Sequence, residues 1–512
     1  MISLLLTKNL TSLLKWIMIE WFLEHWRGIL FLCWAVYFVL LVGTILLQRR
    51  NPVSSVAWIL SLSLLPFVGL FIYHFFGPKK IQKQRMTRAQ KRLFVHRQQK
   101  IWENRLNITA LDEKFCPIVN LIRETTNMPP TYTTAYQIYS GGEATYNAIF
   151  KSIENAQEYI LLEYYIFAPD QTGTKLRDLL IKKLNQGVRV FLLVDGMGSI
   201  SLRRRFMKDF ETAGGHLSYF HKISMLTSSS LINFRNHRKI LICDGKIAFT
   251  GGVNITDTQD LRIDPNAYHD VHMCFEGPIV DWFQTVFVED WYYSNRDDEE
   301  LLHFLKEKSD ERLKRHNEQV QIICDELKIP PLSMQLIPSG PDNDLAPILR
   351  VMVEAMHKAQ HRLYLTTPYL VPDESAFFAL TSAALRGVDV KVLVPKKTDT
   401  YIVGKAAQSW YEDLIRSGVK LYTYMPRMIH TKTLIIDEDI SFIGSTNFDY
   451  RSFYLNFELS VVSYSETINK DLVDEFYQSL EQSELVDLDE LINLPLHERL
   501  IRASARLMSP IL

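Results

Sequence analysis

The sequence predicts an α/β protein of two tandem α/β/α halves that pack face to face, preceded by an N-terminal hairpin of two transmembrane helices. Three observations lead to this prediction. One short stretch occurs twice, an alternation of strand-like and helix-like segments occurs twice, and two long apolar runs lie near the N-terminus. The chain has 512 residues, which fits two or three domains because single domains usually have about 100–200 residues.

Two apolar runs predict the transmembrane hairpin, which we place at residues 27–77. The first run, 28–47, has no charged side chain and is about as long as a helix that crosses roughly 30 Å of hydrocarbon. The second run, 53–76, is of similar length and has no charged side chain apart from His74. Only the segment QRRNP connects the two runs, so the chain after residue 77 is expected on the same side of the membrane as the N-terminus.

A basic juxtamembrane segment, 78–130, indicates which side this is. Nine basic residues and no acidic residue lie between Lys79 and Lys100, whereas the connection between the apolar runs holds only Arg49 and Arg50. By the positive-inside rule, the main body of the chain faces the cytoplasm. The same basic residues suit anionic lipid headgroups, at about 1 kcal/mol for each residue near the surface. A solvated linker helix is the alternative interpretation of this segment.

Residues 1–26 precede the hairpin and mix apolar runs with Lys8, Lys15, Glu20 and Glu24. This mixture is typical of an amphipathic helix that lies in the membrane interface. A cleaved signal peptide is the alternative, but no small-residue cleavage pattern is present and two further apolar runs follow directly. We therefore expect an interfacial helix here.

Strand-like apolar runs and helix-period segments alternate twice after the basic segment, as in an α/β architecture. The first copy reads strand 159–167, helix 174–186, strand 187–196, helix 201–213 and strand 216–220. The second reads strand 361–370, helix 374–386, strand 387–395, helix 400–416 and strand 419–424. Gly187 and Gly387 are 200 residues apart, and His237 and His430 are 193 apart, so the offset is nearly constant. This pattern indicates tandem duplication.

The boundaries of the two halves follow from a charged stretch between them. Residues 297–319 contain many opposite charges at i,i+4 spacing and little apolar content, as a solvent-facing helix does, and we extend this stretch to 330. We expect this stretch to be a connector. The first half is then expected at 131–296 and the second half at 331–512.

The repeated stretch carries the residues suited to chemistry. It reads HRKILICD at 237–244 and HTKTLIID at 430–437. Since side chains alternate along a strand, His237 and Lys239 are expected on one face, as are His430 and Lys432 in the second copy. If the halves pack face to face, two imidazoles and two ammonium groups converge on one cleft. That set of groups fits a phosphodiester.

The four groups suit two-step transfer through a phosphohistidine. The ammonium groups bind phosphate oxygens, one imidazole can attack phosphorus, and the other can protonate the leaving oxygen. With an ordinary histidine pKa of about 6.5, one imidazole can be neutral while the other is protonated. The residues leave open which histidine is the nucleophile. This chemistry requires no metal and no other cofactor, and the sequence shows no recognisable metal cluster.

Small and polar residues follow each motif and are expected to complete the substrate pocket. They are Gly252 and Asn254 in the first copy and Ser445 and Asn447 in the second. Small residues let the backbone approach a ligand, and asparagine can donate to phosphate oxygens.

Four carboxylates near the motifs have two different expected tasks. Asp244 and Asp437 open the turns after the motif strands, so each is expected to hold a turn and need not touch substrate. Asp270 and Glu458 lie on the next strand of each copy. These two are expected to orient the imidazoles, since a carboxylate usually holds a histidine base in one tautomer.

The duplicated H-x-K-x4-D motif resembles the signature of the phospholipase D superfamily, over about residues 130–512. Within it, RRNP, WILSLSLLPFVG, GSTNFDYRSFYLNFE and the terminal SPIL are similar to bacterial cardiolipin synthases. The resemblance implies two phospholipase D-like halves in a multi-pass protein of the bacterial cell (inner) membrane. It also implies that one phosphatidylglycerol passes its phosphatidyl group to another, which gives cardiolipin and glycerol. The resemblance places the active site on His237, Lys239, Asp244, His430, Lys432 and Asp437.

Other functions stay open at this point. A phospholipase D or a phosphatidylserine synthase would use the same chemistry with water or serine as the acceptor. A membrane-tethered nuclease or nucleic-acid-binding protein is disfavoured, because 57 Lys plus Arg against 58 Asp plus Glu leave a net charge of −1. Complete His-Lys pairs in both copies disfavour a structural protein with a dead site. The sequence does not indicate an oligomeric state.

Overall fold

The computed structural model describes residues 2–47, 52–64, 69, 113–221, 233–295 and 332–511. They fall into two compact units, a helical unit at the N-terminus and an α/β unit that contains both repeats. The expected connector 297–330 lies outside the described residues, as do most of the basic segment 78–130 and the end of the second apolar run.

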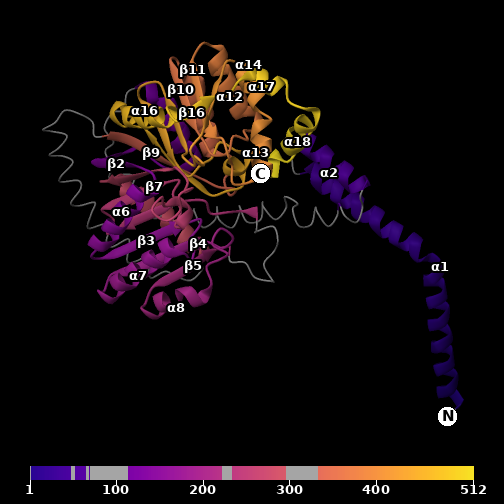
Figure 1. Ribbon diagram of the computed structural model, residues 1–512. Helices are drawn as coiled ribbons and strands as arrows, with labels where there is room; N and C mark the ends of the chain where they lie inside the picture. Colours follow the sequence, from indigo (N-terminus) through magenta and orange to yellow (C-terminus); the bar gives the residue numbers. More distant parts are fainter. Residues whose placement is uncertain are drawn as a thin grey trace. The chain divides into compact units, whose positions relative to one another are not determined.

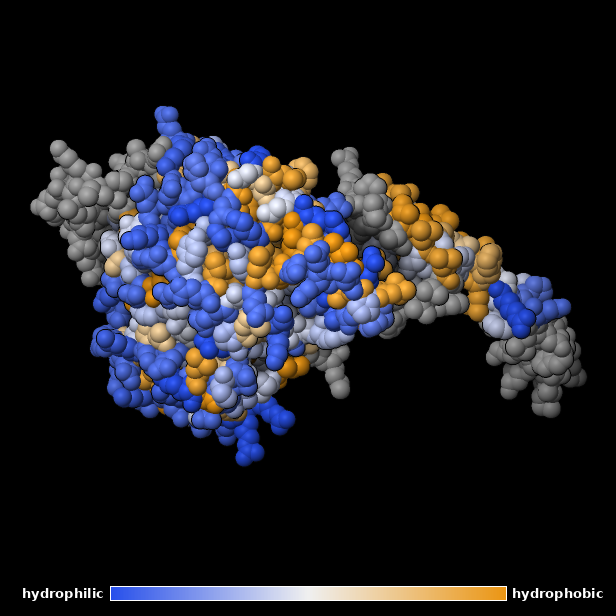
Figure 2. Space-filling model, turned by 45° about the horizontal axis from the view of Figure 1, so that its top comes forward, coloured by the Kyte–Doolittle hydropathy of each residue, from blue (hydrophilic) through white to orange (hydrophobic). Residues whose placement is uncertain are grey.

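The helical unit begins with one long helix, α1 (Ile2–Leu47), which continues without a break past the boundary expected at residue 26. Its stretch Glu24–Leu47 has a mean hydropathy of 2.6 and is the one described helix long and apolar enough to cross a membrane. Helix α2 (Pro52–Leu64) packs its Leu62 against Leu41 and Ile45 of α1. Figure 2 shows hydrophobic side chains over much of the described surface of this unit, with a hydrophilic stretch beside the grey N-terminal part. The structure therefore supports one apolar helix, and a second membrane crossing remains a proposal.

The α/β unit contains two mixed sheets (Figure 1). Both sheets have the same internal strand order. The first sheet runs β2 (Ala135–Ser140), β8 (Val271–Glu276), β7 (Ile247–Gly251), β6 (Ile240–Cys243), β3 (Tyr159–Tyr164), β4 (Arg189–Asp195), β5 (His216–Phe220). The second runs β1 (Thr131–Thr133), β9 (Leu332–Ser339), β15 (Glu458–Ser463), β14 (Ile440–Gly444), β13 (Thr433–Ile436), β10 (Arg362–Thr366), β11 (Asp389–Pro395), β12 (Lys420–Tyr424), β16 (Ser483–Leu485). From β2 to β5 and from β9 to β12, equivalent strands occupy equivalent places, as a duplicated α/β fold requires.

Helices cover both sheets. In the first half they are α6 (Gly142–Asn155), α7 (Gln171–Asn185), α8 (Arg204–Thr212) and α9 (Ile279–Ser294). In the second half they are α11 (Pro347–Lys358), α12 (Glu374–Leu385), α13 (Tyr401–Gln408), α14 (Tyr411–Arg416), α15 (Tyr450–Tyr454), α16 (Glu466–Leu480), α17 (Leu488–Ile492) and α18 (Leu496–Arg506). The single helix expected at 400–416 is therefore two helices, because Ser409 and Trp410 interrupt it.

One large core joins the halves. It contains side chains of β3, β4 and β6 from the first sheet, most of α9, and apolar residues of the second sheet and its helices. A second core fills the space between the first sheet and its outer helices α6, α7 and α8. Because so much apolar surface is shared, the two halves form a single unit.

The chain enters the second sheet before it builds the first. Helix α5 (Cys116–Thr126) packs against α11 and β9, and β1 pairs antiparallel with β9. The side chain of Gln335 donates to the Met128 carbonyl at 2.7 Å and fixes this early segment. The segment before β2 thus ties the two halves together in addition to their shared core.

Candidate active site

Two short backbone pairings bring the motifs together. The His237 N–H donates to the Phe457 carbonyl at 2.9 Å, and the Phe457 N–H donates to the Arg235 carbonyl at 2.8 Å. In the same way His430 donates to the His269 carbonyl at 2.6 Å, and His269 donates to the Met428 carbonyl at 2.9 Å. Each motif therefore runs beside the segment that leads into the next strand of the opposite half.

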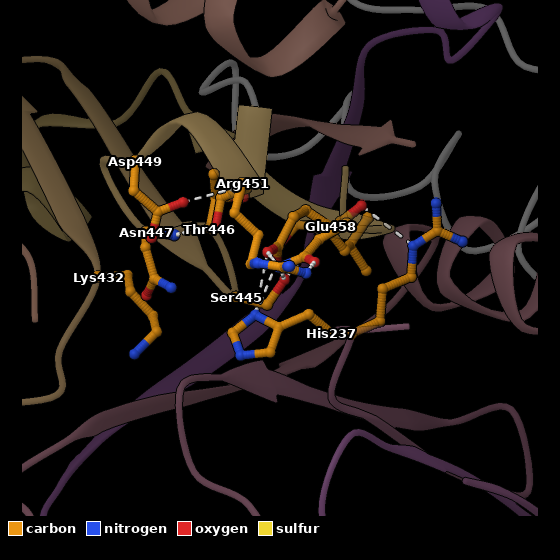
Figure 3. A network of polar contacts seen from close by, with 12 residues as sticks. His237, Lys432, Ser445, Thr446, Asn447, Asp449, Arg451 and Glu458 are labelled. Atoms are coloured by element: carbon orange, nitrogen blue, oxygen red, sulfur yellow. Dashed lines mark hydrogen bonds and ion pairs between the residues drawn. The ribbon is translucent and has the colours of Figure 1, made fainter. Parts of the chain in front are cut away.

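This pairing brings each carboxylate that was expected to orient a histidine next to the histidine of the opposite half. His237 Nδ1 lies 3.0 Å from Glu458 Oε1, and His430 Nδ1 lies 2.6 Å from Asp270 Oδ2. Figure 3 shows the His237 ring pointing at Glu458, which comes from the second half. The structure thus brings together all four residues, but neither carboxylate contacts the histidine of its own copy. With Nδ1–H donating to the carboxylate, Nε2 is the nitrogen free to react.

Burial and mutual repulsion set the protonation of the cationic groups. Burial and the neighbouring lysine charges lower the pKa of His237 to about 4, against the opposing charge of Glu458. Burial also lowers the pKa of Lys239 to about 7 and that of Lys432 to about 8. The pKa of His430 is lowered by burial and by Lys432. An anion placed among these groups would reverse these shifts, as expected of a phosphate site.

The two lysines are held by their own motifs. Lys239 Nζ donates to the His237 carbonyl at 2.7 Å, and Lys432 Nζ donates to the His430 carbonyl. Burial alone would raise the pKa of Asp270, but the charges of Lys432 and His430 lower it overall. The pKa of Glu458 is lowered in the same way by His237 and Lys239. Both carboxylates are therefore charged and balance part of the positive charge.

The motif aspartates occupy the turns after the motif strands. Asp244 and Asp437 have φ values of 53° and 47°, in the left-handed region that aspartate tolerates better than most residues. The Asp244 carboxylate accepts three backbone N–H groups, from Gln157 and Glu158 at 2.8 Å and from Tyr159 at 3.0 Å. Asp437 accepts the N–H groups of residues 360–362, at 2.7 to 3.2 Å. Each carboxylate thus ties a motif hairpin to the start of β3 or β10.

We expect Asp244→Asn and Asp437→Asn to lower activity and thermal stability together. Each change removes charge-assisted hydrogen bonds, which are worth about 1.5–3 kcal/mol when lost. Turnover and melting temperature should be measured on the same preparations. Asp178→Asn, an exposed aspartate of α7, serves as the control. Inactive variants with unchanged melting would place these carboxylates in the catalytic machinery instead.

The difference between Gly252 and Ser445 follows from the orienting carboxylates. A Cβ on Gly252 would lie 2.1 Å from Asp270 Oδ1, so no side chain fits there. In the second half the longer Glu458 leaves room for Ser445, whose hydroxyl donates to Glu458 (Figure 3). Gly252 therefore leaves the space that the Asp270 carboxylate occupies, whereas Ser445 forms a hydrogen bond with the Glu458 carboxylate.

The two asparagines expected in the pocket have different environments. Asn254 Oδ1 accepts the Ile166 N–H at 3.2 Å, so its amide oxygen supports the loop after β3. Asn447 Oδ1 is buried, and among the described residues it has no hydrogen-bond partner. Figure 3 shows Asn447 beside Lys432.

Sequence reasoning missed several residues around the histidines. The Tyr165 ring lies 4.9 Å from the His237 ring, and the Tyr268 ring lies 5.6 Å from the His430 ring. Arg238, between His237 and Lys239, points to the opposite face, where it forms a buried ion pair with Asp290 and donates to the Glu458 carbonyl at 3.0 Å. The alternation of side chains along the motif strand could have predicted that Arg238 points away from His237 and Lys239. It could not have predicted the partners of Arg238.

Comparison with known proteins identifies the family. A model described as "Cardiolipin synthase, PLD-like domain" matches residues 149–291 and 352–480, one stretch in each half. The cardiolipin synthase of Geobacillus sp. strain WCH70 is 32% identical over 505 residues, which cover 96% of each chain. The chain belongs to the cardiolipin synthase family. Its resemblance to the phospholipase D superfamily is thereby confirmed, and it is a phosphatidyltransferase of that type.

Further matches agree with this assignment. Cardiolipin synthase 1 of Bacillus cereus strain ATCC 14579 is 31% identical over 488 residues, covering 94% of this chain and 93% of that protein. A phospholipase D-nuclease N-terminal model matches residues 30–78, the region of the apolar runs. The crystal structure of the Haemophilus influenzae Rd KW20 phosphatidylserine synthase shares the fold. The two structures match with a TM-score of 0.56 and 13% sequence identity. The match covers 77% of the present chain and 100% of the phosphatidylserine synthase chain.

Proposed function

We propose that this enzyme transfers the phosphatidyl group of one phosphatidylglycerol to a second, through a phosphohistidine, and releases glycerol as cardiolipin forms. The observation that carries the proposal is the exchanged arrangement of two buried imidazoles, each held by a carboxylate of the opposite half. Neither half alone contains an oriented histidine, so the two halves act as one site. Six motif residues make up the machinery: His237, Lys239 and Asp244, with His430, Lys432 and Asp437.

In the first step we assign His237 as the nucleophile. Its lowered pKa keeps the imidazole neutral near pH 7, so the lone pair on Nε2 is available. Nε2 bonds to phosphorus, and the bond from phosphorus to the headgroup glycerol oxygen breaks. His430, whose lowered pKa rises when the phosphate anion enters the site, is then protonated and gives its proton to that oxygen. Lys239 and Lys432 neutralise the phosphoryl oxygens as charge develops.

The second step reverses these roles. Neutral His430 accepts a proton from the terminal hydroxyl of the acceptor phosphatidylglycerol, and that oxygen attacks phosphorus. The bond from His237 Nε2 to phosphorus breaks, which frees His237 and completes cardiolipin. His430 gives one proton to the leaving glycerol and takes one from the acceptor hydroxyl. The enzyme therefore returns to its starting state without a nucleotide.

The membrane arrangement belongs to the same proposal. The apolar helix Glu24–Leu47 would anchor the enzyme in the bacterial cell membrane, with residues 53–76 as a second crossing. The packing of Leu62 on Leu41 and Ile45 supports a helical hairpin. The basic residues Lys79–Lys100 would hold the catalytic halves near anionic lipid on the cytoplasmic side.

A single-lipid assay tests the function. Purified enzyme in vesicles of phosphatidylglycerol, without nucleotide, should produce cardiolipin and glycerol in equal amounts. Phosphatidic acid as the main product would show a hydrolase. Phosphatidylserine formed preferentially on addition of serine would show a serine transferase. A strict requirement for CTP would exclude the phosphohistidine route.

The lysine pKa values predict the pH dependence of the free enzyme. A lysine is charged below its pKa, so Lys239 and Lys432 lose their charge as the pH rises through about 7 and about 8. We expect kcat/KM for phosphatidylglycerol to fall between about pH 7 and pH 9, since kcat/KM reports the free enzyme. In Lys239→Arg, the fall should begin at higher pH. A profile that stays flat to pH 9, or an unshifted fall in Lys239→Arg, would contradict this.

A further inference from the structure

The extended segment before β6 presents three basic residues on one face. His237 and Lys239 share this face, and alternation places Arg235 there too. Asn236 and Arg238 turn the other way, where they contact Glu163 and Asp290. In the second half the position of Arg235 is taken by Met428, which is buried. The first motif therefore carries a cation that the second motif lacks.

The guanidinium of Arg235 is poorly satisfied. Its Nη1 is buried and, within the described part of the chain, has no hydrogen-bond partner. The Arg235 backbone is nevertheless fixed, because its carbonyl accepts the Phe457 N–H at 2.8 Å. A buried N–H donor without an acceptor is costly unless a ligand supplies the acceptor.

A second guanidinium lies nearby. Arg451, from α15 of the second half, donates to Asn233 Oδ1 at 2.7 Å and to the Asn233 carbonyl at 3.0 Å, two residues before Arg235. Burial and the charge of Arg235 both lower the pKa of Arg451, so the two cations repel each other. Arg451 also reaches Asn456, whose amide donates to Glu458 at 3.1 Å, next to His237.

Two carboxylates whose charges act on these arginines, Asp195 and Asp449, are already engaged. Asp195 accepts the backbone N–H groups of Met197 at 2.9 Å, Gly198 at 2.8 Å and Asn236 at 2.7 Å. Asp449 caps α15 by accepting the Ser452 N–H at 2.6 Å. These charges offset part of the local positive potential, but in the described residues neither carboxylate forms an ion pair with Arg235. Arginine is the side chain best suited to a phosphate diester, through paired N–H donors.

We infer that Arg235 and Arg451 form a second anion subsite, which holds the phosphate of the acceptor phosphatidylglycerol while the donor phosphate lies between the His-Lys pairs. This inference rests on the proposed function. Two residues of extended chain, about 6.6 Å, separate Arg235 from His237. In cardiolipin one glycerol joins the two phosphates, so the acceptor phosphate must sit one glycerol away from the reacting phosphorus. Arg235 and Arg451 would hold that phosphate while the hydroxyl at the other end of the glycerol lies beside His430.

Two acceptors of different charge test the inference in the full-length enzyme. In vesicles of phosphatidylglycerol with added isotopically labelled glycerol, the phosphohistidine can react with glycerol, which has no phosphate, or with phosphatidylglycerol. The first reaction returns labelled phosphatidylglycerol and the second gives cardiolipin. We expect Arg235→Gln to lower cardiolipin formation by about 10- to 100-fold relative to exchange. Arg235→Lys should lie between this variant and the original enzyme, because it keeps the charge but loses the paired donors.

The outcomes are distinguishable. Arg177→Gln, an arginine of α7 that contacts Phe206, should leave both reactions unchanged. If the ratio of cardiolipin formation to exchange is the same in Arg235→Gln as in the original enzyme, the acceptor subsite is refuted. If the original enzyme performs neither reaction, the proposed function itself fails.

Discussion

Replacing either His237 or His430 by asparagine is expected to lower cardiolipin formation by at least about 10⁴-fold. Asparagine keeps an N–H that can donate to the carboxylate of the opposite half, but it offers neither a nucleophilic nitrogen nor an exchangeable proton near neutral pH. The initial rate of cardiolipin release from phosphatidylglycerol vesicles measures the effect. Melting temperatures should stay close to that of the original enzyme, since each side chain is replaced by one of similar size.

The double variant provides the control for this expectation. Because the histidines act as a unit, His237→Asn with His430→Asn should be no slower than either single variant. A single variant that keeps more than about 1% of the rate would show that the remaining histidine suffices. That result would be inconsistent with the division of roles proposed above.

The second large effect is expected for Glu458→Gln. Glutamine can still contact His237 Nδ1, but it cannot stabilise an imidazolium and does not enforce the tautomer with Nε2 free. By analogy with carboxylates that orient other catalytic histidines, kcat should fall by about 10²- to 10⁴-fold. Asp270→Asn should act similarly through His430. Steady-state kinetics on vesicles, with melting curves in parallel, measure both variants.

The exchanged geometry makes this prediction specific. Glu458 lies in the second half but contacts the histidine of the first half, at 3.0 Å. In Glu458→Gln the formation of the phosphohistidine should therefore be slowed directly. If kcat is unchanged, or if the loss merely follows a loss of folded protein, the orienting role of Glu458 is wrong.

Much of the α/β unit was predictable because duplication is visible in the sequence. The repeated order of apolar runs corresponds to β3, β4 and β5 in the first half and β10, β11 and β12 in the second. Period-2 alternation also indicated that His237 and Lys239 share a face. These features depend on the order of apolar and polar residues close together in the chain, which can be read from the sequence.

The contacts between the two halves could not be predicted from such local patterns. Asp270 and Glu458 were expected to orient histidines, and each contacts a histidine across the interface. These contacts follow from the pairing of His237 with Phe457 and of His430 with His269, which depends on how the halves pack. The difference between Gly252 and Ser445 was visible in the sequence. Its cause, the space needed by the Asp270 carboxylate, was not.

The membrane region was only partly predictable for a different reason. Apolar length predicts that a segment can cross a bilayer, and α1 fits this at Glu24–Leu47. The expected interfacial helix 1–26 is continuous with that helix in the structure. Where one helix ends and the next begins depends on packing within the unit.

Trapping the covalent intermediate shows whether a phosphohistidine forms and on which histidine. His430→Asn should be incubated with a phosphatidyl ester of a nitrophenol, which needs no protonation to leave, and the digested protein examined by mass spectrometry. We expect one phosphatidyl group per chain, attached to His237 through nitrogen and labile to acid. No adduct in this variant, together with an adduct on His430 in His237→Asn, would contradict the assignment of His237, and no adduct on either histidine would contradict the phosphohistidine mechanism itself.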